Sequence, residues 1–136
     1  MPDQSPLAAL LRVLVVTPET TVLDTQADAV TVTLVDGEYG IAPQHAPMIG
    51  RLGYGELRIK VGAATQRFYA DAGFVQVVDN VVSVLTNRAI PAAAVDVPAA
   101  AEHLRAALGR PAAGNEELAI RDRLISQSRG QLRVAT

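Results

Sequence analysis

The residues best suited to chemistry lie in one short segment, residues 37–47, which reads Gly-Glu-Tyr-Gly-Ile-Ala-Pro-Gln-His-Ala-Pro. It offers the Glu38 carboxylate and the His45 imidazole, groups used in proteins for proton transfer and metal ligation. Its two glycines permit the positive φ angles of a tight turn. Pro43 and Pro47 fix φ and remove backbone donors, so the loop cannot extend a sheet. These features predict a stiff, exposed loop that presents His45 to a partner.

Catalysis and metal binding find little support around this segment. His103, the other histidine, falls in an alanine-rich stretch and is expected at the surface, and no nucleophile-elbow motif is present. His45 with Asp36 or Glu38 gives too few ligands for a metal. The absence of cysteine excludes disulfides, thiolate metal sites and cysteine nucleophiles. We therefore expect no catalytic residue and no bound metal.

Composition limits the remaining classes of function. A chain of 136 residues fits one domain, or one domain with a small appendage. A net charge of −2 and an aromatic fraction of 4% give neither a basic surface nor stacking platforms for nucleic acid. No apolar run approaches the roughly 18 residues of a membrane span, and the first residues lack the features of a secretory peptide. We expect a soluble chain that does not bind nucleic acid.

The first part of the chain has the pattern of β-strands. Apolar and polar side chains alternate in residues 30–34 and 56–61, so each segment buries one face. Turn signals separate such segments at residues 36–37, 53–55, 62–63, 71–73 and 79–80. This rhythm predicts an antiparallel β-sandwich over residues 11–90, after a flexible extension over residues 1–10. Candidate core residues are Phe68, Phe74, Val77, Val84 and Leu85.

From Arg88 onward the composition changes, which predicts a two-helix antiparallel hairpin over residues 91–136 and a fold class of mainly β with α. Pro91 breaks the last strand and residues 92–94 form a linker. Asp96 can cap a first helix that Gly109 ends. A second helix starts at Gly114-Asn115. Its apolar stripe comprises Leu118, Leu124, Ile125 and Leu132.

Stability of the hairpin is expected to be marginal. The apolar stripe is narrow, and Gly130 destabilises a helix interior by about 1 kcal/mol relative to alanine. Short helices in water depend mostly on tertiary packing. The hairpin should therefore be ordered by docking and be detachable.

The segment at residues 37–47 resembles a signature of the epsilon subunit of the rotary F-type ATP synthase, Gly-x-aromatic/apolar-Gly-Ile/Val-x-Pro-x-His-Ala/Thr-Pro. Further motifs match in order between Leu11 and Asn87, among them residues 15–24, 52–59, 73–77 and 81–85. The resemblance implies a non-catalytic rotor subunit that couples the gamma subunit to the membrane c-ring for proton-driven ATP synthesis. A preference for arginine, with Lys60 the sole lysine, indicates a bacterial origin. The implied location is peripheral, on the cytoplasmic face of the bacterial cell membrane through the complex.

The same resemblance implies rotor contacts. In the family the Gly-Glu turn and the Pro-x-His loop lie together at the bottom of the sandwich and face the c-ring, which gives Glu38, Gln44, His45 and Pro47 as candidates. Family members commonly have glycine where this chain has Gln44, whose Cβ penalises a positive φ. The alternative is that Glu38 is a solvated turn residue and His45 a packing imidazole bonded to backbone.

Contacts with other synthase subunits follow in the same way. The small residues Ala70, Ala72 and Gly73 are candidates for the gamma contact, with intersheet packing as the alternative. The family's hairpin folds against the sandwich or extends along the rotor shaft and blocks ATP hydrolysis. Its second helix meets an acidic loop of the catalytic beta subunits, for which the candidates are Arg121, Arg123, Arg129 and Arg133. The alternative is a solvated charged face.

Some bacterial members bind ATP through an Ile/Leu-Asp-x-x-Arg-Ala motif in the hairpin. Residues 95–100 keep Asp96, but Ala99 replaces the arginine that would supply donors for phosphate. We interpret Asp96 as an N-cap and expect no cofactor. Outside the family, the competing interpretation is a soluble β-sandwich module that binds a protein or small ligand and has a helical dimerisation tail.

Overall fold

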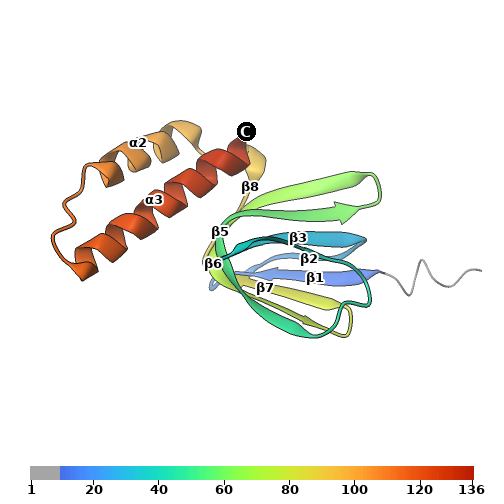
Figure 1. Ribbon diagram of the computed structural model, residues 1–136. Helices are drawn as coiled ribbons and strands as arrows, with labels where there is room; N and C mark the ends of the chain where they lie inside the picture. Colours follow the sequence, from blue (N-terminus) through green and yellow to red (C-terminus); the bar gives the residue numbers. More distant parts are fainter. Residues whose placement is uncertain (1–9) are drawn as a thin grey trace, which may run out of the picture.

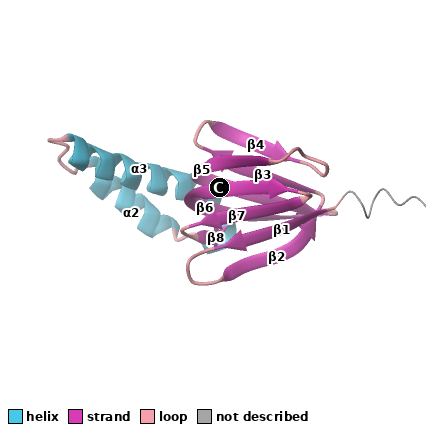
Figure 2. Ribbon diagram, turned by 90° about the horizontal axis from the view of Figure 1, so that it is seen from below, coloured by secondary structure: helices cyan, strands magenta, loops and turns pink. Residues whose placement is uncertain are grey.

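The computed structural model describes residues 10–136, so the expected extension over residues 1–10 lies outside it except for Leu10. An eight-stranded sheet comes first and two helices follow, with the helices at one end of the strands in both views (Figures 1 and 2). The fold is therefore mainly β with α, as predicted. The strands are β1 (Leu11–Val16), β2 (Thr21–Ala27), β3 (Ala29–Leu34), β4 (Gly37–Ile41), β5 (Met48–Val61), β6 (Ala64–Val78), β7 (Val81–Thr86) and β8 (Ala89–Pro91).

The two layers of the sandwich share one long ribbon. Strands β5 and β6 pair antiparallel along their whole lengths, from Met48 opposite Val77 to Val61 opposite Ala64. One half of this ribbon continues through β7, β1 and β2, and the other half carries β3, β4 and β8. The predicted antiparallel sandwich is confirmed with one exception, because β1 and β7 run parallel.

The ribbon changes direction where two residues adopt positive φ. Ala72 has φ 59° and Gly73 has φ 112°. A Cβ on Gly73 would lie 1.9 Å from the Leu85 carbonyl oxygen, so glycine alone fits there. After this bend β6 pairs with β7, and before it with β8. The bend thus lets one strand serve both layers.

The core is a single cluster built from alternate residues of both layers. Phe68, Val77 and Val84 are buried as predicted. Phe74 and Leu85 were also expected in the core, but they are 50% and 46% exposed. The two-residue period explains this correction, because their neighbours Val75, Val77, Val82 and Val84 point inward.

The helical part begins with a short 3₁₀ helix, η1 (Ala92–Ala94), where an irregular linker was expected, and Pro91 still belongs to β8. Helix α2 (Val97–Leu108) has the predicted N-cap, because the Asp96 carboxylate accepts a hydrogen bond from the Ala99 amide at 3.0 Å. Gly109 ends α2, and α3 (Asn115–Ala135) follows. Within the described residues 10–136, no helix is long and apolar enough to cross a bilayer.

Helix α3 packs on both α2 and the sheet. Ala100 and Ala107 are the buried residues of α2. In α3 the fully buried positions are Ser128, Gly130 and Val134. The predicted stripe is only half-buried at Leu124, Ile125 and Leu132, and Leu118 is 41% exposed. The stripe prediction assumed one contact surface, whereas α3 divides its apolar residues between two neighbours.

Candidate functional site

The loop at residues 42–47 joins β4 to β5 and is held in one conformation. Gln44 has φ 71°, the left-handed region that favours the glycine common in the family. Its amide donates a hydrogen bond to the Asn80 side-chain oxygen at 2.7 Å. This bond links the loop to the β6–β7 turn and helps to hold Gln44 in a conformation that its Cβ disfavours.

His45 is half-buried and uses both ring nitrogens. Nδ1 lies 2.6 Å from the Ala46 carbonyl oxygen, which only accepts, so Nδ1 carries the proton. Nε2 is hydrogen-bonded to the Tyr39 hydroxyl at 2.7 Å, and the two rings meet edge to face with centroids 5.6 Å apart. The imidazole therefore braces the loop, as the packing alternative predicts, and neither nitrogen is left open for proton transfer or a metal.

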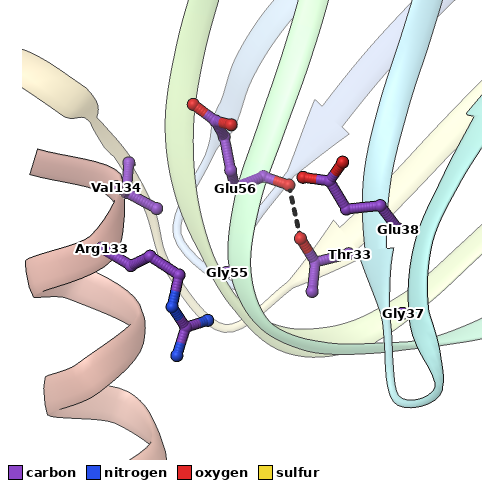
Figure 3. Close-up of a pocket in the computed structure, with 7 residues that line it drawn as sticks. All are labelled: Thr33, Gly37, Glu38, Gly55, Glu56, Arg133 and Val134. Carbon is purple, nitrogen blue, oxygen red and sulfur yellow. Dashed lines mark hydrogen bonds between the residues drawn. The ribbon is translucent and has the colours of Figure 1, made fainter. Parts of the chain in front are cut away.

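Glu38 lies away from this loop, at the opposite end of β4. It is exposed, pairs with Arg58 at 3.3 Å, and borders a pocket together with Arg133 and Val134 of α3 (Figure 3). The His45 loop instead borders a hollow with Asp79 and Asn80. Glu38 and the His45 loop therefore border different hollows, and their contact with the c-ring stays a prediction.

A chain of charges continues from Glu38 to the end of α3. Arg58 bonds Glu56 at 2.6 Å, and hydrogen bonds to Glu56 and then Glu38 raise the pKa of the Arg58 guanidinium. Glu56 also pairs with Arg67, whose guanidinium donates to the Val134 carbonyl at 2.8 Å. This carbonyl belongs to the last turn of α3, where such acceptors lack helical partners. Arg67 thus caps α3 from the sheet.

The residues expected to contact gamma do not form an exposed surface. Ala70 is 5% exposed and belongs to the core, so its assignment as a contact is wrong and the intersheet alternative applies. Gly73 occupies the bend described above. Ala72 is half-buried beside Ile125 and Arg129 of α3. Small residues here serve packing within the chain.

A different surface, which sequence reasoning missed, is apolar and open. Ile49 is 74% exposed, Phe74 50% and Leu85 46%. Strand register places Phe74 opposite Leu85, and Leu85 opposite Val16, on the outer face of one layer. We call Ile49, Phe74, Leu85 and Val16 the outer apolar patch. The alternation of buried and exposed residues in β6 could have predicted this surface. Because Val75 and Val77 point inward, Phe74 must point outward.

The arginines of α3 do not share one face. At about 100° per residue, Arg121 and Arg123 point in widely different directions. Arg121 donates to the Leu108 carbonyl at 3.3 Å and caps the end of α2. Arg129 and Arg133 border one groove beside Gly37, and Arg123 is exposed. Arg121 therefore has a structural role between the helices, and the other arginines remain as candidates.

Asp96 borders a pocket between the helices and the sheet, together with Ala99, His103 and Gln127. The arginine that borders this pocket, Arg88, is paired with Asp71 at 3.0 Å. Asp96 itself is engaged as the N-cap of α2. His103 is exposed, as predicted. Among residues 10–136 no group of three His, Cys, Asp or Glu side chains is arranged to hold a metal.

A buried polar cluster beneath α3 also escaped sequence reasoning. Asp71 is 4% exposed and accepts hydrogen bonds from Arg88, Tyr69 and Gln127. Burial, and next the charge of Asp71, raise the pKa of the Tyr69 hydroxyl. No spacing in the sequence joins Asp71 with Gln127, because they lie 56 residues apart.

Comparison with known proteins gives consistent matches. Residues 10–92 match the family described as ATP synthase, Delta/Epsilon chain, beta-sandwich domain. A Rhodopirellula baltica protein named ATP synthase epsilon chain is 46% identical over 92% of this chain and 98% of its own length. A Symbiobacterium thermophilum protein, also named ATP synthase epsilon chain, is 44% identical over 71% of this chain and 70% of its own length.

Two solved structures have the same fold. A chain of the Euglena gracilis mitochondrial ATP synthase, OSCP/F1/c-ring in rotational state 1, aligns with a TM-score of 0.85 at 19% identity, over 94% of this chain and 82% of that one. A chain of the Tetrahymena thermophila mitochondrial ATP synthase central stalk/c-ring aligns with a TM-score of 0.74 at 16% identity, over 93% and 96%. At these identities the likeness concerns the fold alone.

Proposed function

Because this chain belongs to the epsilon-chain family of the F-type ATP synthase, we propose that it is a non-catalytic rotor subunit that joins the gamma subunit to the c-ring. It transmits torque during proton-driven ATP synthesis and restrains ATP hydrolysis through α2 and α3. Its location is then peripheral, on the cytoplasmic face of a bacterial cell membrane. The family match favours this function over a stand-alone binding module with a dimerisation tail, and α3 packs on its own sandwich.

The observation that supports gamma binding is the outer apolar patch. Ile49, Phe74 and Leu85 are large exposed side chains on the outer face of one layer, where Arg51 lies opposite Phe74 and Gln76 opposite Ile49. An exposed apolar patch among polar residues marks an interaction site in soluble proteins. We assign it to gamma in place of Ala70, Ala72 and Gly73. The loop carrying Gln44, His45 and Pro47 leads directly into β5, the strand that carries Ile49.

The c-ring contact is proposed at the other end of β4. Among the candidates, the Glu38 side chain is 56% exposed, and the neighbouring Val35 is 64% exposed at the tip of the β3–β4 hairpin. His45, by contrast, has both ring nitrogens bonded within the chain. The loop of Gln44, His45 and Pro47 stays a candidate for the same contact. Glu38, whose carboxylate is exposed, is the better candidate for polar loops of the c-ring.

For the inhibitory contact we retain Arg123, Arg129 and Arg133. Arg129 and Arg133 are exposed beside the sandwich. Within residues 10–136 neither forms a salt bridge with an acidic side chain. When α3 leaves the sandwich, their charges become available to an acidic loop of a beta subunit. Neutralising these three arginines should abolish inhibition if the contact is electrostatic, whereas unchanged inhibition would reject this role.

We propose no nucleotide cofactor for the hairpin, since Asp96 caps α2, Ala99 offers no side-chain donor and Arg88 is engaged by Asp71. Equilibrium dialysis of the full chain against ATP tests this. Submillimolar affinity would overturn it.

The central experiment measures ATP hydrolysis by an epsilon-depleted catalytic complex of the same organism, titrated with the full chain or with residues 1–94. The shorter version ends after β8, because β8 pairs with β6 and an earlier end would remove a strand. We expect both to bind gamma and only the full chain to inhibit. Failure of both to bind would reject the rotor function, and inhibition by both would reject the role of the helices.

A further inference from the structure

Helix α3 contacts the sandwich through a polar group as well as through apolar packing. The Asp71 side chain in β6 is 5% exposed, although it carries a charge. Burying a carboxylate is unfavourable unless it is paired and hydrogen-bonded. The buried Asp71 carboxylate therefore needs hydrogen-bond donors. The elements that supply these donors indicate the role of the contact.

Two of the donors belong to the sandwich. Arg88 Nε lies 3.0 Å from Asp71 Oδ2, and the Tyr69 hydroxyl lies 3.3 Å from Oδ1. In addition, the backbone of Asp71 is fixed, because its amide donates a hydrogen bond to the Thr86 hydroxyl at 2.9 Å. These partners come from β6 and from the segment around the end of β7. None of these partners of Asp71 belongs to α3.

The remaining donor belongs to α3. Gln127 Nε2 lies 3.2 Å from Asp71 Oδ1 and 3.4 Å from Oδ2, so one amide group spans both carboxylate oxygens. Gln127 lies about one helical turn before Gly130, which packs against the Tyr54 backbone of β5. If α3 leaves, water can replace this amide while Arg88 and Tyr69 stay bonded. The contact is thus specific to the docked position.

We propose that Asp71 and Gln127 form a latch that holds the helical hairpin on the sandwich. A hydrogen bond to a charged group contributes more than a neutral one, yet it is readily exchanged for water when the site opens. A contact of this kind stabilises docking without making it permanent. Its consequence for inhibition rests on the proposed function, but the latch itself can be tested on the isolated chain.

The test uses Gln127→Glu, which keeps the size of the side chain and places a second carboxylate against Asp71. The matched control is Ser126→Glu, which adds the same charge to the same helix at an exposed position. Because the chain contains no cysteine, spin labels at Ala119→Cys in α3 and Gln66→Cys in β6 report the docked distance without further changes. Circular dichroism verifies that the sheet stays folded.

We expect Gln127→Glu to increase the undocked population by about tenfold or more, because it removes a charge-assisted bond and adds repulsion. Ser126→Glu should leave the distance distribution unchanged. The double variant Asp71→Asn with Gln127→Glu exchanges donor and acceptor and should restore docking. A wild-type distribution for Gln127→Glu, an equal effect of Ser126→Glu, or no rescue in the double variant would overturn the latch.

The consequence for inhibition is measured separately. Gln127→Glu should lower the concentration of chain needed to inhibit hydrolysis, since release of α3 no longer breaks the latch. If the spin-label distances change as expected and inhibition does not, the latch stands and the inhibitory role of α3 fails. If the distances do not change, the latch fails whatever the hydrolysis assay shows.

Discussion

Gly130 of α3 lies directly against the Tyr54 carbonyl oxygen of β5, so close that a Cβ on Gly130 would be 2.6 Å from that oxygen and 3.1 Å from the Tyr69 ring. The sequence marks Gly130 as a weak point of the helix. In the structure the same glycine lets the helix pack directly against the backbone of β5. Its missing side chain therefore weakens the isolated helix and permits docking.

Gly130→Ala should separate these two effects. Alanine favours the helix by about 1 kcal/mol, but the backbone carbonyl of Tyr54 cannot yield easily to a Cβ. We expect helix content to persist while the docked state loses about 1–3 kcal/mol. The spin-label distance in the isolated chain measures docking. Ser126→Ala, at an exposed position of the same helix, is the control for helix propensity, and undiminished docking in Gly130→Ala would show that the sheet adjusts.

Ile49→Ser should weaken gamma binding. Ile49 is 74% exposed, so its replacement should change the free energy of unfolding by no more than about 0.5 kcal/mol. Burial of its side chain at an interface would contribute about 1–2 kcal/mol, which is roughly a tenfold change in affinity. Titration calorimetry with gamma measures this.

Val61→Ser is the matched control for Ile49→Ser. Val61 is also exposed and apolar, at 38%, but it lies at the far end of β5, beside the β5–β6 turn and away from the outer apolar patch. Its replacement should leave gamma affinity unchanged. Equal losses for both variants would show that gamma does not select the patch.

Gln44→Gly should stabilise the chain. Gln44 holds φ 71°, which a residue with a Cβ adopts at some expense and glycine adopts freely. The unfolded chain gains entropy from glycine, so the net gain in unfolding free energy is about 1 kcal/mol or less. Gln44→Val should instead be destabilising, because β-branching makes this φ less favourable. Urea unfolding of the original chain, Gln44→Gly and Gln44→Val gives the order of their unfolding free energies. A lower unfolding free energy for Gln44→Gly than for the original chain would contradict backbone strain at Gln44.

Tyr69 should titrate late in the folded chain. Burial, together with the charge of Asp71, raises the pKa of its hydroxyl above the value of the unfolded chain. The folded state therefore favours the neutral hydroxyl over the phenolate. The resulting contribution to the free energy of unfolding is fully present below about pH 10 and is lost as the pH rises beyond it. Absorbance at alkaline pH should show one phenol that ionises only as the chain unfolds.

Tyr69→Phe provides the check on that titration. It should remove the late phase and lower the free energy of unfolding at neutral pH by about 1 kcal/mol, through loss of the bond to Asp71. A late phase that persists in Tyr69→Phe would assign it to another tyrosine.

The local sequence by itself determined the strands, the turns and the helical ends. Alternation along residues 30–34 and 56–61, the capping carboxylate of Asp96 and the motif at residues 37–47 act through near neighbours, so their physical effect is visible in the sequence. Apolar character taken alone misplaces Phe74 and Leu85. The same alternation turns them outward, because Val75 and Val84 next to them point into the core.

Only the tertiary structure decided which distant residues meet. Strand β4 separates the hollow that Glu38 borders from the one at the His45 loop, although the two residues are near in sequence. The docking of α3 brings Gln127 to Asp71 and Gly130 to Tyr54. These contacts depend on the bend at Gly73 and on the packing of a helix against a sheet. Contacts between residues so far apart in the sequence depend on how the whole chain folds, so residue spacing alone does not predict them.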